Sequence, residues 1–100
     1  SNIDAIVQGS RAQGIMQGGG QQFARLKYVQ RTDEVKVGDT VVTSGLGGVF
    51  PKGLVLGTVV VAEKGEKGLF QYVEVKPAVD FTKLEEVLVL LPERSKEKRK

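Results

Sequence analysis

Ser44 is the hydroxyl whose neighbours come closest to those of a catalytic nucleophile. It follows the valine-rich run at 40–43 and precedes Gly45, which is similar to the strand–serine–glycine order of a nucleophile elbow. A serine becomes nucleophilic only when a neighbouring group takes its proton. The chain has no histidine and no cysteine, so only a lysine or a carboxylate is available for that task. The pattern favours a hydroxyl that caps a turn, with a serine hydrolase as a competing hypothesis.

Two pairs of carboxylates are the other candidates for chemistry. Asp33-Glu34 and Glu85-Glu86 are each adjacent in sequence, so their side chains diverge on an extended strand. A glycosidase needs two carboxylates that face one substrate across about 5–10 Å. Without histidine or cysteine, the chain also lacks the commonest nitrogen and sulfur ligands of metals. The sequence predicts solvated carboxylates, and no catalytic residue, metal site or cofactor.

The segment from Ser44 to Gly57 holds five of the 13 glycines and one of the three prolines. Its glycine-rich start at 45–48 is not followed by the Gly-Lys-Ser/Thr of a phosphate-binding loop, and no long helix begins there. Glycine adopts positive φ angles and permits close backbone contacts, and proline fixes φ at about −65°. We therefore predict a tightly shaped corner between strands at 40–43 and 58–63.

Short stretches of alternating or β-branched apolar residues fill most of the remaining chain. We expect strands at 3–7, 11–17, 23–29, 40–43, 58–63, 69–76 and 87–91, with one helical turn within 80–86. The residues expected to face the core from 23–29 and 69–76 are Ala24, Leu26, Tyr28, Leu69, Val73 and Val75. A polar loop at 64–68 should join two strands as a hairpin. This spacing predicts an all-β fold, a small antiparallel barrel or sandwich of about six to seven short strands.

The net charge of +3 comes from the end of the chain. Residues 93–100 carry five basic and two acidic side chains, so the other 92 residues are balanced. A balanced body argues against a nucleic-acid-binding face, which needs clustered lysine and arginine. We predict a β-domain over 1–92 and a disordered basic tail over 93–100, with contact to an anionic lipid or polymer as the alternative role for the tail.

The chain shows neither a membrane-spanning apolar run nor a signal peptide. The abrupt start in a strand-like segment favours a fragment of a longer protein over a complete cytoplasmic one.

Phe70 and Tyr72 share the face of the 69–76 strand that also carries Glu74 and Lys76. Two interpretations stay open. The aromatic side chains pack beneath the corner, or they form a contact patch for another protein, because aromatic residues beside charges are common at interfaces.

The stretch from Gly38 to Gly57 closely resembles the signature of the rod shape-determining MreC family, and so do the flanking segments at 26–29, 70–77 and 84–90. The resemblance covers roughly residues 1–92. It implies the extracytoplasmic β-barrel part of a membrane-anchored scaffold with no enzymatic activity. The family organises cell-wall elongation, through contacts with MreD, a class B penicillin-binding transpeptidase and its glycosyltransferase partner, with an indirect link to MreB. Some members also self-associate.

Two sets of candidate residues result, one from the family signature and one from the apolar and aromatic residues of the corner and the 69–76 strand. The structural motif consists of Gly38, Asp39, Ser44, Gly45, Gly47, Gly48, Phe50, Pro51, Gly53 and Gly57. The candidate partner contacts are Leu54, Leu56, Phe70 and Tyr72. Against this scaffold hypothesis stands a carbohydrate- or nucleic-acid-binding barrel that uses the aromatic face and the basic tail.

Overall fold

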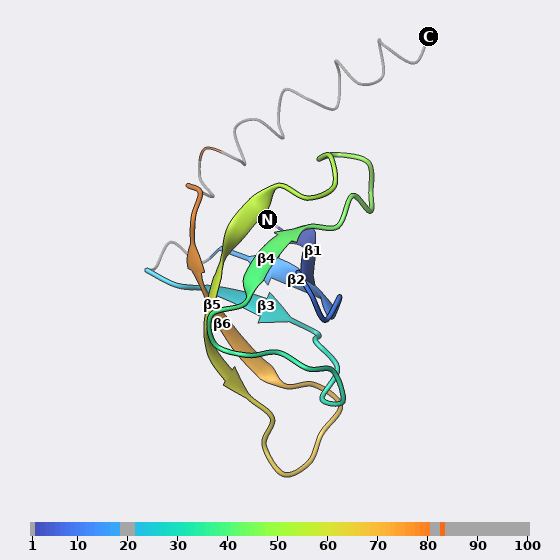
Figure 1. Ribbon diagram of the computed structural model, residues 1–100, viewed down its shortest axis with the longest axis vertical. Coiled ribbons are helices and arrows are strands. Elements are labelled where there is room, and N and C mark those ends of the chain that lie inside the picture. Colours follow the sequence, from blue (N-terminus) through green and yellow to red (C-terminus); the bar gives the residue numbers. More distant parts are fainter. Residues whose placement is uncertain (1, 19–21, 81–82, 84–100) are drawn as a thin grey trace, which may run out of the picture.

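The computed structural model describes residues 2–18, 22–80 and 83. In these ranges the chain forms an all-β antiparallel barrel, which confirms the expected fold class (Figure 1). The strands are β1 (Asn2–Val7), β2 (Gln13–Gln17), β3 (Ala24–Lys27), β4 (Thr40–Thr43), β5 (Val55–Glu63) and β6 (Tyr72–Pro77). The expected strand at 87–91, most of the helical turn at 80–86 and the tail at 93–100 lie outside the described residues. The domain boundary at residue 92 therefore stays a prediction.

The barrel closes in the order β1-β2-β3-β6-β5-β4, so every strand has a neighbour on both sides. Closure depends on two short contacts between strands that are distant in sequence. Residues 5–7 of β1 pair with residues 41–43 of β4, and residues 24–25 of β3 pair with residues 74–75 of β6. Alternating side chains from all six strands fill the interior. The fully buried hydrophobic residues include Val7, Met16, Leu26, Val29, Val41, Val59, Val73 and Val75.

β5 is longer than expected and has an irregular register. It begins at Val55, three residues before the expected start, so the corner spans 44–54 rather than 44–57. The pairing with β6 shifts between Val59 and Val61, which marks a β-bulge. Of the three consecutive valines, only Val59 is fully buried, and Val60 and Val61 are half-buried. Three consecutive valines in 58–63 predict a strand buried on both faces, and this is wrong, because Thr58 is exposed and the bulge turns the residues after Val59.

Tyr28 lies on the outer surface, which corrects the expectation that it faces the core. β3 ends at Lys27, and Tyr28 has a φ of 66°. Pairing with the segment before β6 resumes at Gln30 and Phe70, one residue out of the register of β3 with β6. A bulge of this kind re-aims a side chain, so Tyr28 is 53% exposed and Val29 is fully buried.

Leu69 is also misplaced by simple alternation. β6 begins at Tyr72, so Leu69 belongs to the connection from β5 and is 79% exposed. The hairpin expected at 64–68 is confirmed, since β5 and β6 are antiparallel neighbours, but the connection continues to residue 71.

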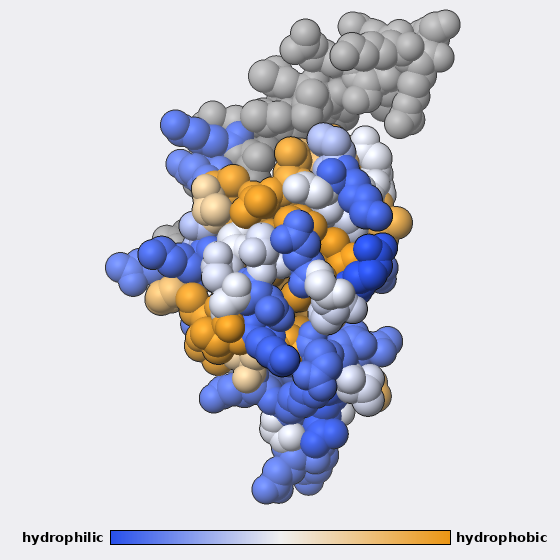
Figure 2. Space-filling model, viewed as in Figure 1, coloured by the Kyte–Doolittle hydropathy of each residue, from blue (hydrophilic) through white to orange (hydrophobic). Residues whose placement is uncertain are grey.

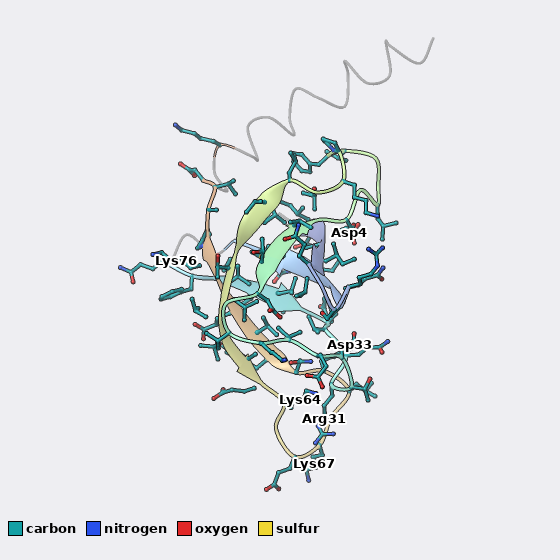
Figure 3. All side chains as sticks on the ribbon, in the orientation of Figure 1. Asp4, Arg31, Asp33, Lys64, Lys67 and Lys76 are labelled. Atoms are coloured by element: carbon teal, nitrogen blue, oxygen red, sulfur yellow. The ribbon has the colours of Figure 1, made fainter. Side chains whose placement is uncertain are left out.

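Arg31 and Gln71 fasten this hairpin to the preceding loop. The Arg31 guanidinium donates to the carbonyl oxygens of Lys64, Gly65 and Glu66 over 2.9–3.2 Å, and its side chain lies against the hairpin in Figure 3. The Gln71 amide, 4% exposed, donates to the carbonyls of Gln30 and Asp33 at 2.9 and 2.8 Å. Within the described residues, no helix is long and apolar enough to span a membrane.

Candidate functional site

Thr43, whose side chain is 2% exposed, fastens the corner at 44–54 to β4. Its hydroxyl donates a hydrogen bond to the Pro51 carbonyl oxygen at 2.6 Å and accepts one from the Leu54 N–H at 2.8 Å. Its backbone N–H donates to Leu54 O, and its carbonyl accepts from Gly53 N, both at 2.8 Å. These four bonds hold the corner in one shape. Sequence reasoning missed Thr43, because a threonine at a strand end carries no signal of its burial.

Four glycines of the corner have left-handed φ angles, namely Gly45 (84°), Gly47 (83°), Gly48 (70°) and Gly53 (94°). At Gly53 nothing lies within 4 Å of the position that a Cβ would occupy. The backbone conformation alone therefore demands glycine there, since other residues are strained at this φ. At Gly57 the surrounding atoms, and not the backbone angle, demand glycine. A Cβ there would lie 2.7 Å from Val75 Cγ1 and against the Lys76 carbonyl. Glycine at this position allows β5 and β6 to approach closely.

Ser44 and Asp39 act as turn caps at the two ends of β4. The Ser44 hydroxyl accepts a hydrogen bond from the Leu46 N–H at 3.1 Å, which confirms the predicted turn-capping role. The Asp39 carboxylate accepts one from the Lys36 N–H at 2.9 Å, beside Gly38 with its φ of 99°. Within 2–18, 22–80 and 83, no three acidic side chains lie together in a way that could hold a metal ion.

The corner carries an exposed apolar surface, here called the corner tip. It consists of Leu46, Val49, Leu54 and Val55, each between 43% and 59% exposed. Hydrophobic residues gather in the upper part of the view in Figure 2, where the corner lies, and hydrophilic residues surround the hairpin at the lower end. The exposed apolar residues of the corner thus lie at the end of the barrel opposite the β5–β6 hairpin (Figure 1).

Phe50 and Leu56 connect the corner tip with the hydrophobic core. Phe50 is half-buried and packs against the hydrophobic core, and together with Leu54, Val55 and Val79 it lines a small apolar hollow. Leu56 is 2% exposed and belongs to the core. The expectation that Leu56 contacts a partner is therefore wrong, because alternation along β5 places it inside, next to the outward-facing Val55.

A second surface, here called the aromatic face, consists of Tyr28, Phe70 and Tyr72. These rings are 53%, 48% and 37% exposed. Tyr28 and Phe70 meet edge to face, with centroids 5.5 Å apart and an interplanar angle of 79°. The interpretation that Phe70 and Tyr72 pack beneath the corner is wrong, because they lie on the outside of the barrel. Tyr28 was missed because alternation assigned it to the interior.

Tyr72 is held between two charged neighbours. The Arg25 guanidinium lies over its ring, 4.0 Å from the centroid, and its phenol donates a hydrogen bond to the Glu74 carboxylate. This hydrogen bond raises the pKa of Tyr72 above its ordinary value, since loss of the phenolic proton would place two negative oxygens together. Residues 25 and 74 are direct partners across β3 and β6, so the pairing of the strands sets this arrangement.

The matches of this chain to known proteins agree on one family. The family model described as "Rod shape-determining protein MreC, barrel core" matches residues 1–91. The cell shape-determining protein MreC of Geobacillus stearothermophilus is 42% identical over 87 residues, which cover 83% of this chain and 30% of that protein. The chain thus spans about a third of the length of this curated relative.

Solved structures show the same fold. The crystal structure of MreC from Pseudomonas aeruginosa superimposes with a TM-score of 0.71 at 32% identity, over 76% of this chain and 50% of that one. A complex between penicillin-binding protein PBP2 and MreC from Helicobacter pylori matches with a TM-score of 0.68 at 23% identity, over 79% of this chain and 49% of that one. The matched residues include the corner, β5 and β6, and on these grounds the chain belongs to the MreC family of rod shape-determining proteins.

Proposed function

We propose that this barrel is a non-enzymatic scaffold module that helps to determine cell shape by binding a class B penicillin-binding transpeptidase outside the cytoplasm. The observation that carries the proposal is the corner tip, an exposed apolar surface on a corner whose shape four hydrogen bonds of Thr43 fix. A surface that is ordered before binding loses little conformational entropy when a partner docks. The MreC of Helicobacter pylori forms a complex with PBP2, which supports this class of partner.

The corner tip is apolar, as the buried centre of an interface usually is. Leu46, Val49 and Leu54 offer apolar area, and the hollow beside Leu54 and Val55 can receive an apolar side chain of the partner. The structural motif residues serve this surface indirectly, by fixing the backbone on which it stands. Contacts of the longer protein with MreD, the glycosyltransferase and, through them, MreB belong to the same proposal, as does self-association.

The test measures binding of the 100-residue chain to the purified extracytoplasmic part of the class B transpeptidase from the same organism. Leu54→Asp places a charge in the centre of the corner tip and should weaken binding by about tenfold or more. Val37→Asp is the matched control, because Val37 is 68% exposed and precedes β4, at the opposite end of that strand from the corner.

Equal affinity of the native chain, Leu54→Asp and Leu46→Asp would show that the corner tip is not the contact. If Val37→Asp weakens binding as much as Leu54→Asp does, the effect comes from the added charge in general and not from the corner tip. Circular dichroism of each variant establishes that the barrel remains folded, so that a lost contact is distinguished from a lost fold.

A further inference from the structure

The aromatic face offers open ring surfaces in fixed positions. Tyr28 and Phe70 are each about half exposed, and their edge-to-face contact holds the two ring planes nearly perpendicular. The Gln30–Phe70 bridge anchors one ring, and the left-handed backbone of Tyr28 turns the other outward. A bulky residue at positive φ is strained, and such strain is retained where the surrounding structure compels it, often at binding sites. The molecule thus holds two aromatic planes toward solvent at the cost of local strain.

Hydrogen-bond donors and acceptors lie around these aromatic rings. Arg25 lies over the Tyr72 ring, and the Lys27 ammonium lies 5.9 Å from the Tyr28 ring centroid. Glu74 is held by the Tyr72 phenol, and Glu63 pairs with Tyr72 across β5 and β6. Hydrogen-bond donors and acceptors therefore both lie beside the aromatic rings. The hydroxyls of a sugar both donate and accept, and a pyranose ring has an apolar C–H face, so this pattern matches the chemistry of a carbohydrate.

The same features disfavour other ligands. A peptide cannot add here as an extra strand, because β3 lies between β2 and β6, and β6 between β3 and β5. A single-stranded nucleic acid also stacks on aromatic rings, but it requires a surface dominated by cations. The cations that the structure records against these rings are Arg25 and Lys27, and the carboxylates beside Tyr72 are Glu74 and Glu63. A nearly balanced rim fits an uncharged polar chain better than a polyphosphate.

From this arrangement we infer that the aromatic face is a carbohydrate-binding site, which takes an uncharged oligosaccharide by stacking pyranose rings on Phe70 and Tyr28. Arg25, Lys27 and Glu74 bond to the hydroxyls at the edges of the sugar rings. The site does not include the corner-tip residues, although Tyr28 borders one open hollow together with Leu46. A barrel with both surfaces can bind a protein partner and a glycan on the same domain.

The chain contains a built-in reporter for this site. It has no tryptophan and only two tyrosines, and both tyrosines belong to the aromatic face. Tyrosine fluorescence of the whole chain therefore reports on this surface alone. The probes are a β-linked N-acetylglucosamine hexamer, a β-linked glucose hexamer and an α-linked glucose hexamer, with oligo(dT) as the nucleic-acid probe. We expect a saturable change with at least one hexamer, with a dissociation constant on the order of 1 mM or below.

Two substitutions test the contact without disturbing the fold. Phe70→Ala should weaken binding by about tenfold, because a stacking ring is lost. Tyr28→Asn should also weaken binding by about tenfold, as measured by nuclear magnetic resonance titration. Asparagine tolerates the left-handed backbone, so the bulge should be retained. Leu54→Ala is the control, because Leu54 is 46% exposed, close to the 48% of Phe70, but lies at the corner tip. It should leave hexamer binding unchanged.

Three results would overturn the inference. They are the absence of a response to every hexamer, equal binding by the native chain and both aromatic variants, and tighter binding of oligo(dT) than of any hexamer. If the first result is found and Phe70→Ala also loses transpeptidase binding, the aromatic face is a protein contact instead. Retained transpeptidase binding by Phe70→Ala, together with lost hexamer binding, would support two independent surfaces.

Discussion

The hydroxyl of Thr43 lies 2.6 Å from the carbonyl oxygen of Pro51 and donates a hydrogen bond to it. Pro51 stands in the corner that precedes β5, and Thr43 is the last residue of β4, so this contact ties the corner to the end of β4. Together with the other three hydrogen bonds of Thr43, it supports the backbone that carries the exposed apolar residues of the corner.

Replacing Thr43 tests how far this contact sets the corner. Thr43→Val keeps the shape of the side chain but leaves the Pro51 carbonyl and the Leu54 N–H without their partner. We expect a loss of about 1–3 kcal/mol in the free energy of unfolding, measured by urea denaturation. Thr43→Ser retains the hydroxyl and should lose less. A larger loss in Thr43→Ser than in Thr43→Val would mean that the methyl group matters more than the hydroxyl.

Alanine at Gly57 and alanine at Gly53 should each lower the stability of the barrel, but for different reasons. At Gly57 the added Cβ meets Val75 and the Lys76 backbone, so β5 and β6 must separate, and we expect a cost of about 1–3 kcal/mol or more. At Gly53 the space is open and only the left-handed φ opposes the change, at about 1–2 kcal/mol. Gly53→Asn should recover part of that cost, and Gly57→Asn should not. Thermal melting of the four variants distinguishes strain from collision.

Arg31 should control the mobility of the β5–β6 hairpin. Arg31→Gln removes the guanidinium that bonds to three successive carbonyls at 64–66. We expect amide hydrogen exchange in 64–68 to rise by about tenfold, with little change in the core strands. Lys67→Gln serves as the control, because it alters the charge of the same hairpin and leaves the Arg31 contacts in place. A uniform rise across the whole barrel would contradict a local role for Arg31.

The raised pKa of Tyr72 predicts a defined pH dependence. The fold favours the protonated phenol, so its hydrogen bond to Glu74 contributes below the ordinary tyrosine pKa and is lost as the pH rises through the raised value. Glu74→Gln removes the main cause and should lower the Tyr72 midpoint, followed by phenolate absorbance in a Tyr28→Phe background. An unchanged midpoint would show that Glu74 does not hold the phenol.

Ser44 should prove to be a structural residue. Its hydroxyl caps the start of the corner, so Ser44→Ala should lower the free energy of unfolding by about 0.5–1.5 kcal/mol. The native chain should not react with an activated phosphonate that labels nucleophilic serines. Covalent labelling that disappears in Ser44→Ala would revive the serine hydrolase hypothesis.

Local chemistry was sufficient to predict the six described strands, though not all of their bounds, together with the hairpin and the corner. Valine-rich alternation marks strands because successive side chains point to opposite faces, and glycines such as Gly45 and Gly53 mark backbone that other residues cannot adopt. Alternation puts Phe70 and Tyr72 on the face opposite Val73 and Val75, but only the structure shows that this face is exposed. Alternation failed at Tyr28, where a bulge shifts the register.

The amino-acid sequence by itself determined the all-β class, the tight turn chemistry and the family signature, because each depends on residues close together along the chain. Tertiary structure alone decided that Tyr28 joins Phe70 on the surface, that Thr43 is buried against Pro51 and that Leu56 is inside while Leu54 is outside. These outcomes depend on strand register and barrel closure, which are set by contacts between residues far apart in the chain.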